Sequence, residues 1–131
     1  MAVEFGGRDV PFLAGEDLSA MQYRYVMQSD DGTVVMHDDG TEISAGILQN
    51  APASGEEAVV RVEGTSKLVA NAAIAVGILV KAEYVGASDN GKADAADTDG
   101  DIARGLTLTA SGAEDDVLTV LLCVSKISVP A

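Results

Sequence analysis

Reactive side chains are scarce in this sequence of 131 residues. It holds one cysteine, Cys123, and one histidine, His37, and it has no tryptophan. A single thiol cannot form an internal disulfide, and one histidine without further ligands cannot build a zinc site. G-x-S-x-G, G-x-G-x-x-G and G-x-x-x-x-G-K-[ST] motifs are also missing, so hydrolase triads and phosphate cradles lack a signature. We therefore expect no enzyme activity, no cofactor and no bound metal.

Basic residues are the second shortage. Eight Lys and Arg stand against 21 Asp and Glu, which gives a formal net charge of −13. Such a charge repels nucleic-acid backbones and anionic membrane surfaces, so we expect neither as a partner. The longest apolar stretch, residues 68–80, is too short to span a bilayer. The N-terminus shows no basic start followed by a long apolar block, which predicts synthesis in a cytoplasm without export.

What the sequence does contain is a succession of short β-prone runs separated by turn residues. Asp-Gly pairs at 31–32 and 39–40 are strong hairpin signals, because glycine adopts positive φ without steric cost. Asp17 could cap a single helical turn over 17–22. The chain length suits one domain. We predict an all-β fold, a small antiparallel barrel or sandwich with little helix. Strands are expected over 22–28, 33–37, 41–50, 56–64, 65–70, 72–86, 102–112 and 115–129.

The core is expected to come from aliphatic residues, because aromatics are only 4% of the chain. Two Val- and Leu-rich runs alternate in a way that places every second residue on one face. The expected core members are Val59, Val60, Val62, Leu118, Val120 and Leu122.

The acidic segment 88–101 is predicted to be a polar loop and is a candidate cation site. Asp97, Asp99 and Asp101 offer closely spaced carboxylates, which hard cations prefer. The twelve-residue calcium-loop pattern is not met, since a sixth-position Gly100 would put Ala95 first and Leu106 last. A solvated surface loop is the alternative interpretation. A small β binding module for a ligand or metal ion, using residues 89–101, is the alternative function.

Three segments carry a resemblance to a known family. They are residues 17–35, 44–80 and 99–122, with G-I-L-Q-N-x-P-x-x-G-E (46–56), V-x-G-x-S-K (62–67) and A-x-A-V-G-I-L-V (73–80) as the best marks. In this order they resemble capsid cement, or head decoration, proteins of tailed bacteriophages. The marks are turn and core residues rather than catalytic ones. Ile78 stands where relatives often have a polar residue.

The resemblance implies a structural protein rather than an enzyme. Such proteins bind the outer surface of an expanded phage head and stabilise contacts between capsomers, commonly as homotrimers. The implied partners are the major capsid protein and further copies of the chain. The implied location is the outer capsid surface of the virion, after synthesis in the cytoplasm of the bacterial host.

Residues 1–16 are expected to form an extended N-terminal arm, followed by a single β domain over 17–131. Glycines and Pro11 interrupt regular structure in this segment. Phe5, Phe12 and Leu13 would be apolar anchors on a neighbouring subunit or the capsid, with Arg8 at the rim. The alternative is that these anchors fold back on their own barrel. On the arm hypothesis, deleting residues 1–14 leaves the melting temperature nearly unchanged and weakens association.

Overall fold

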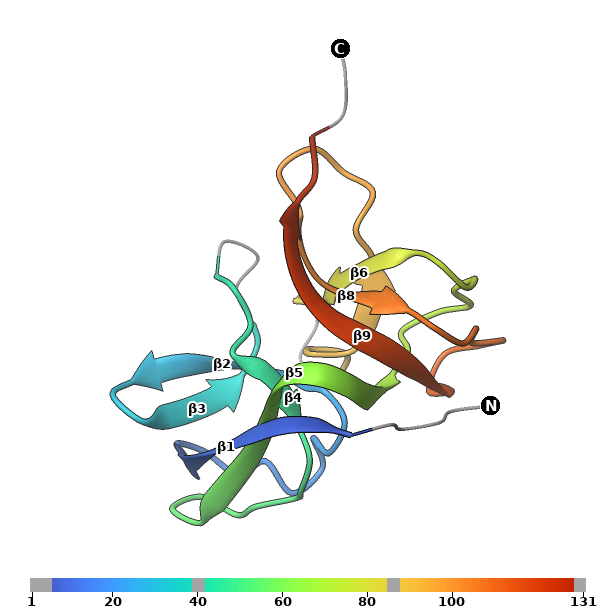
Figure 1. The fold of residues 1–131 in the computed structure, drawn as a ribbon. Helices are drawn as coiled ribbons and strands as arrows, with labels where there is room; N and C mark the ends of the chain where they lie inside the picture. Colours follow the sequence, from blue (N-terminus) through green and yellow to red (C-terminus); the bar gives the residue numbers. More distant parts are fainter. Residues whose placement is uncertain (1–5, 39–41, 85–87, 129–131) are drawn as a thin grey trace.

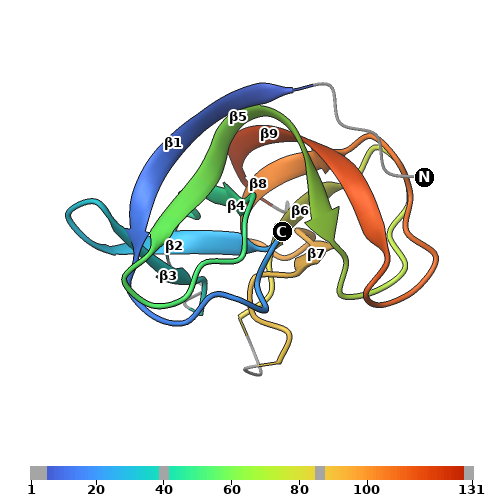
Figure 2. The same cartoon turned by 90° about the horizontal axis from the view of Figure 1, so that it is seen from below.

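The described part of the chain is built from β-strands. The computed structural model describes residues 6–38, 42–84 and 88–128, and within these ranges it contains no α-helix. These ranges contain nine strands, which are drawn as arrows in Figure 1, with β7 labelled in Figure 2. They are β1 (Gly7–Ala14), β2 (Tyr25–Asp30), β3 (Thr33–Met36), β4 (Gly46–Leu48), β5 (Glu57–Val69), β6 (Leu79–Ala82), β7 (Ala93–Ala95), β8 (Ile102–Thr107) and β9 (Val117–Lys126). The predicted all-β fold is confirmed.

Turn chemistry explains several of these boundaries. Gly32, with φ of 66°, closes the tight connection between β2 and β3, as the Asp-Gly pair predicts. The stretch 17–22 makes hydrogen-bonded turns instead of a helical turn, with the amide of Ser19 donating to Asp17 Oδ1 at 3.1 Å. No described residue belongs to a helix long and apolar enough to cross a membrane.

The sheet forms two rings that share β5. Its strand order is β1-β3-β2-β4-β5-β9-β8-β6-β7, and β1 also pairs with β5. The first five strands in this order therefore close a circle, which we call the N-terminal ring. The other end of β5 begins a second circle, the C-terminal ring, which runs through β9, β8, β6 and β7. An isolated bridge from Ala70 to Ala93 joins β7 to the end of β5. The two lobes are visible in Figure 1.

Strand β5 serves both rings because it bends at Gly64. Residues before the bend face β1 and β4, whereas Thr65–Val69 face β9. Gly64 has φ of 92°, and a Cβ there would meet the Cα of Gly7 at 2.5 Å. The expectation of separate strands over 56–64 and 65–70 is therefore wrong, since the glycine bends one strand rather than ending it. Figure 2 shows β1, β5 and β9 curving alongside one another.

Each ring encloses its own hydrophobic core, and the middle strands contribute to both. Tyr25 and Ile47 pack in the core of the C-terminal ring, whereas their neighbours Val26 and Leu48 pack in the core of the N-terminal ring. Of the expected core residues, Val60, Leu118, Val120 and Leu122 are buried. Val62 packs against the N-terminal core while partly buried, and Val59 is partly buried outside both clusters.

Three sequence expectations need correction. Residues 7–14 are a strand of the N-terminal ring rather than part of an arm separate from the domain, because β1 forms seven facing pairs with β5. In the described part of the expected strand 72–86, residues 72–84, the strand is limited to Leu79–Ala82, and Ile74 adds an isolated bridge. The expected loop 88–101 contains β7, whose Ala93 lies in the core.

Candidate functional site

The predicted contact residues near the N-terminus face in different directions. Phe12 packs against the core of its own ring, which is the fold-back alternative and corrects its expected role as an anchor on a neighbour. Leu13 is 48% exposed and Arg8 is exposed, with its guanidinium 3.5 Å from a carboxylate oxygen of Glu63. Phe5 lies outside the described residues. Leu13 and Arg8 therefore stay candidates for an external contact.

The acidic loop uses its carboxylates internally. One oxygen of Asp101 accepts a hydrogen bond from Lys81 Nζ at 3.2 Å, and the other accepts one from the amide of Thr98 at 3.0 Å. Asp97 accepts from the hydroxyl of Thr98 and is exposed, as is Asp99. Among the described residues, no group of three His, Cys, Asp or Glu side chains could hold a metal ion. The loop geometry therefore gives the cation hypothesis no support.

A small polar hollow lies where the two rings meet, next to this loop. It is lined by His37, Glu42, Lys81, Ala82, Tyr84, Asp101 and Ile102. The imidazole of His37 is buried and shares a hydrogen bond of 2.6 Å with the hydroxyl of Ser44. A hollow with room for about one water molecule is too small for a metabolite. It therefore gives little support to a ligand-binding module.

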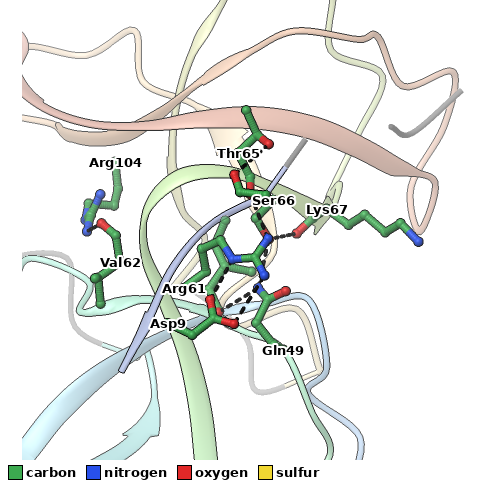
Figure 3. Close-up of polar contacts among 10 residues, drawn as sticks. Asp9, Gln49, Arg61, Val62, Thr65, Ser66, Lys67 and Arg104 are labelled. Carbon is green, nitrogen blue, oxygen red and sulfur yellow. Dashed lines mark hydrogen bonds and ion pairs between the residues drawn. The ribbon is translucent and has the colours of Figure 1, made fainter. Parts of the chain in front are cut away.

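A polar network holds the bend of β5 in place (Figure 3). Arg61 donates to both carboxylate oxygens of Asp9 on β1, from Nε at 2.6 Å and from Nη2 at 3.2 Å. Its other terminal nitrogen donates to the carbonyl of Thr65 at 3.0 Å, on the far side of Gly64. Paired N–H donors match a carboxylate in direction as well as charge. One side chain thus links β1 to β5 and spans the bend.

A second arginine joins the rings directly. Arg104 on β8 is buried and donates to backbone carbonyls of Ser44 at 3.1 Å, Ala45 at 3.2 Å and Val62 at 2.9 Å. These acceptors lie just before β4 and on β5. The two lobes are therefore connected by side-chain bonds as well as by β5.

A buried lysine connects two loops of the C-terminal ring. Lys92 Nζ lies 2.8 Å from Asp89, 3.2 Å from Glu114 and 2.6 Å from Asp115. Burial alone would lower the pKa of Lys92, but the hydrogen bonds to Asp115, Asp89 and Glu114 outweigh it and raise the pKa. This cluster is an internal ion group, and its lysine occupies the place that a cation would need.

Exposed apolar residues on the C-terminal ring are a feature that the sequence interpretation does not identify. Leu108, Val117 and Leu121 are 38%, 37% and 41% exposed. The signal lies in the sequence, because strand alternation that points Leu118, Val120 and Leu122 inward also directs Val117 and Leu121 outward. The inward set belongs to the predicted core, whereas the outward set has no predicted role.

These observations define a class of protein before any comparison. The described chain is an all-β module in which Lys81 and Lys92 are paired with nearby carboxylates and several large apolar side chains are exposed at the surface. Such surfaces are suited to contact with other macromolecules.

Comparison with known proteins finds a solved structure that shares this fold. No protein-family model matches the sequence, and no curated protein matches it. Among solved structures, the chain is similar to the N base of the head fiber protein gp8.5 of bacteriophage phi29. The TM-score is 0.67 at 18% identity, and the match covers 92% of this chain and 98% of that one. At this identity the likeness establishes a shared fold.

Proposed function

We propose that this protein is a structural component of a bacteriophage head, and more specifically a capsid cement protein. It binds the outer surface of the expanded head and stabilises contacts between capsomers. Its partners are the major capsid protein and other copies of itself, as a homotrimer. In this proposal it is not an enzyme, and it is synthesised in the cytoplasm of a bacterial host.

One observation carries the proposal. The fold matches the base of a phage head fiber over nearly the whole of both chains. That neighbour is a phage head fiber protein, and the motifs at residues 46–56, 62–67 and 73–80 resemble those of phage head decoration proteins.

The physical design is consistent with a cement role. The motifs that carry the resemblance help to build the fold. Gly46 lies so close to β5 that a Cβ would meet the carbonyl of Arg61, and Asn50 bonds the backbone of Glu57 and Val59. Many rigid copies, each binding the expanded lattice alone, would stabilise that lattice by mass action. A charge of −13 is tolerable outside the shell, away from the packaged DNA.

Binding to heads tests this function. Purified protein is mixed with expanded heads and with unexpanded proheads of the phage that encodes it, and sedimented. We expect co-sedimentation with expanded heads and a higher temperature of DNA release from them. Equal binding to both particles would contradict the cement role, and absence of binding to either would contradict head association altogether.

The face responsible for head contact can be tested with the two exposed N-terminal residues. We expect Leu13→Asp or Arg8→Glu to weaken co-sedimentation with heads without loss of folding, since both side chains lie at the surface. Gln28→Glu, an exposed change on the neighbouring hairpin, is the matched control. Unchanged binding of both variants would remove this strand from the contact surface.

A further inference from the structure

The outer face of the C-terminal ring carries a row of apolar side chains. Strand pairing sets Leu79 on β6 opposite Leu106 on β8, and Leu106 opposite Leu121 on β9. The neighbouring row, Val80, Gly105 and Leu122, is directed to the opposite face, where Val80 and Leu122 pack in the core. Because successive side chains of a strand alternate, the leucine row points outward.

The same face extends to both sides of this row. Val117 on β9 pairs with Val69 on β5, and Leu108 continues the outward side of β8 just beyond its end. Exposed apolar residues that occur singly need no explanation, but apolar residues that adjoin across three strands mark an interaction surface. We call the set the leucine face; it consists of Val69, Leu79, Leu106, Leu108, Val117 and Leu121.

The charge on this face differs from that of the molecule as a whole. The polar residues interleaved with it are Thr65 and Lys67, which are partly exposed, and Thr119, which its neighbours bury. Within the described strands, no carboxylate lies on this side between Thr65–Val69 of β5 and Leu79 of β6; acids lie at the edges of the face, with Glu63 before the bend of β5, Asp116 before Val117 and Asp94 on β7. The β1–β5 pairing of the N-terminal ring is more acidic, because Glu63 and Glu57 of β5 lie opposite Arg8 and Leu13, and Asp9 of β1 lies opposite Arg61.

We propose that copies of this chain associate with one another through the leucine face. The net charge of −13 makes any two copies repel, and the repulsion is smallest where carboxylates are missing. A second copy is thus favoured by the surface whose centre combines exposed leucines with the fewest acids. This inference rests on the self-association within the proposed function and assigns it a surface.

The test compares one substitution at two places on β9. Leu121→Glu puts a carboxylate in the centre of the leucine face, whereas Val124→Glu makes the same change at a residue that is 58% exposed and lies outside that face. Sedimentation velocity over a concentration series measures the mass against 13.4 kDa for one chain. We expect wild type and Val124→Glu to associate alike, and Leu121→Glu to raise the dissociation constant at least about tenfold.

Two further measurements keep the test decisive. Leu108→Glu places a carboxylate in the leucine face just beyond the end of β8. It serves as the test variant if circular dichroism shows that Leu121→Glu is unfolded. Raising the salt concentration should strengthen wild-type association, because it screens the repulsion between copies. Equal association of wild type and the face variants would overturn the proposal.

The remaining outcomes concern other occupants of the face. A wild-type protein that stays monomeric at every concentration overturns the proposal, whether it binds heads or not. If such a monomer associates only after deletion of residues 1–5, the chain's own N-terminus is the occupant. If Leu121→Glu stays self-associated like wild type but no longer binds heads, the occupant is the capsid. Association lost in Leu121→Glu, together with no head binding by wild type, supports this surface and contradicts the proposed function.

Discussion

The two rings of the molecule are closed by different means. Strand β1 closes the N-terminal ring with seven facing pairs to β5 and two to β3. In the C-terminal ring, the closure between β7 and β5 is a single bridge from Ala70 to Ala93. Next to this bridge Lys92 connects its three carboxylates. Backbone hydrogen bonds thus hold one ring, whereas a charged cluster supports the other.

The cores show a second difference. The core of the C-terminal ring includes Tyr25 from β2 and Ile47 from β4, which belong to the other ring. In the N-terminal ring, the buried core residues come from its own strands and connections. The C-terminal ring therefore depends on the N-terminal ring more than the reverse. We expect mutations that destabilise the N-terminal ring to destabilise the C-terminal ring as well, because the N-terminal ring supplies part of the C-terminal core.

Deleting residues 1–14 should have the largest effect. The structure reverses the arm hypothesis here, because the deletion removes the closing strand, including buried Ala14 and the core contact of Phe12. We expect a loss exceeding about 5 kcal/mol, comparable with the whole stability of many domains, so that the variant is unfolded. Urea denaturation followed by circular dichroism measures this.

The control for that deletion removes residues 1–5 alone and leaves β1 intact. Its stability should stay close to that of the full chain. If the protein lacking residues 1–14 instead melts at the wild-type temperature, β1 contributes little to closure. The contrast between the rings would then be wrong.

Lys92→Met should produce a smaller loss, concentrated in the C-terminal ring. The change leaves three carboxylates near one another without their cation, and we expect a cost of about 1–3 kcal/mol because all three are partly solvated. Hydrogen exchange should accelerate in β7 more than in β1. Lys126→Met, at an exposed lysine, is the control. Uniform acceleration across both rings would argue against a local role.

The stability difference between wild type and Lys92→Met should depend on pH in a way that follows from the shifted pKa values of Asp89 and Lys92. The pKa of Asp89 is lowered, first by its hydrogen bond to Lys92, so its stabilising contribution is present above the ordinary value of about 3.9. That contribution is lost as pH falls through the lowered pKa. The pKa of Lys92 is raised, so its contribution is present below about 10.4 and is lost only in stronger alkali. The gap between wild type and Lys92→Met should therefore be constant from about pH 5 to 9 and shrink outside this range.

Tyr25→Phe should raise the stability of the protein slightly, whereas the preceding variants lower it. Burial raises the pKa of Tyr25, and its hydroxyl has no hydrogen-bond partner among the described residues. A buried hydroxyl without a partner costs about 1–3 kcal/mol, so its removal should raise stability by about 1 kcal/mol. Tyr84→Phe, on an exposed ring, should change little. A loss of stability in Tyr25→Phe would indicate a polar partner for the hydroxyl.

Local chemistry explains which features are predictable from the sequence. The local pair Asp31-Gly32 indicates the β2–β3 hairpin, and the inward set on β9 follows from strand alternation, so both predictions are confirmed. The prediction at Gly64 is wrong because a glycine that bends a strand and one that ends it look alike in sequence. The pairing of β1 with β5 joins residues about fifty positions apart, and no local pattern indicates it.

The candidate surfaces are harder to predict for a related reason. Asp101 carries the right chemistry for a cation loop, but its partner Lys81 comes from another strand. The leucine face draws on β5, β6, β8 and β9, so it exists only once their register is fixed. The direction of Phe12 is likewise decided only when the N-terminal ring closes around it.

The smallest expected change in stability concerns Asp94 on β7, next to the single bridge from Ala70 to Ala93 that closes the C-terminal ring. Its pKa is raised by burial and by the nearby carboxyl of Glu83, while Lys81 opposes the rise. A folded pKa above the unfolded value means that this group favours the folded state below about pH 3.9 and that the advantage disappears as pH rises through the folded pKa. At pH 7 the ionised group is thus unfavourable, and Asp94→Asn should raise stability by at most about 1 kcal/mol, since the side chain is partly exposed. Urea unfolding at pH 7 and at about pH 3.5, below the ordinary carboxyl pKa, measures this, with the exposed turn variant Asp31→Asn as control for net charge. The gain should vanish at the lower pH; a gain equal at both pH values, or equal in the control, would show that the two rings do not differ in this respect.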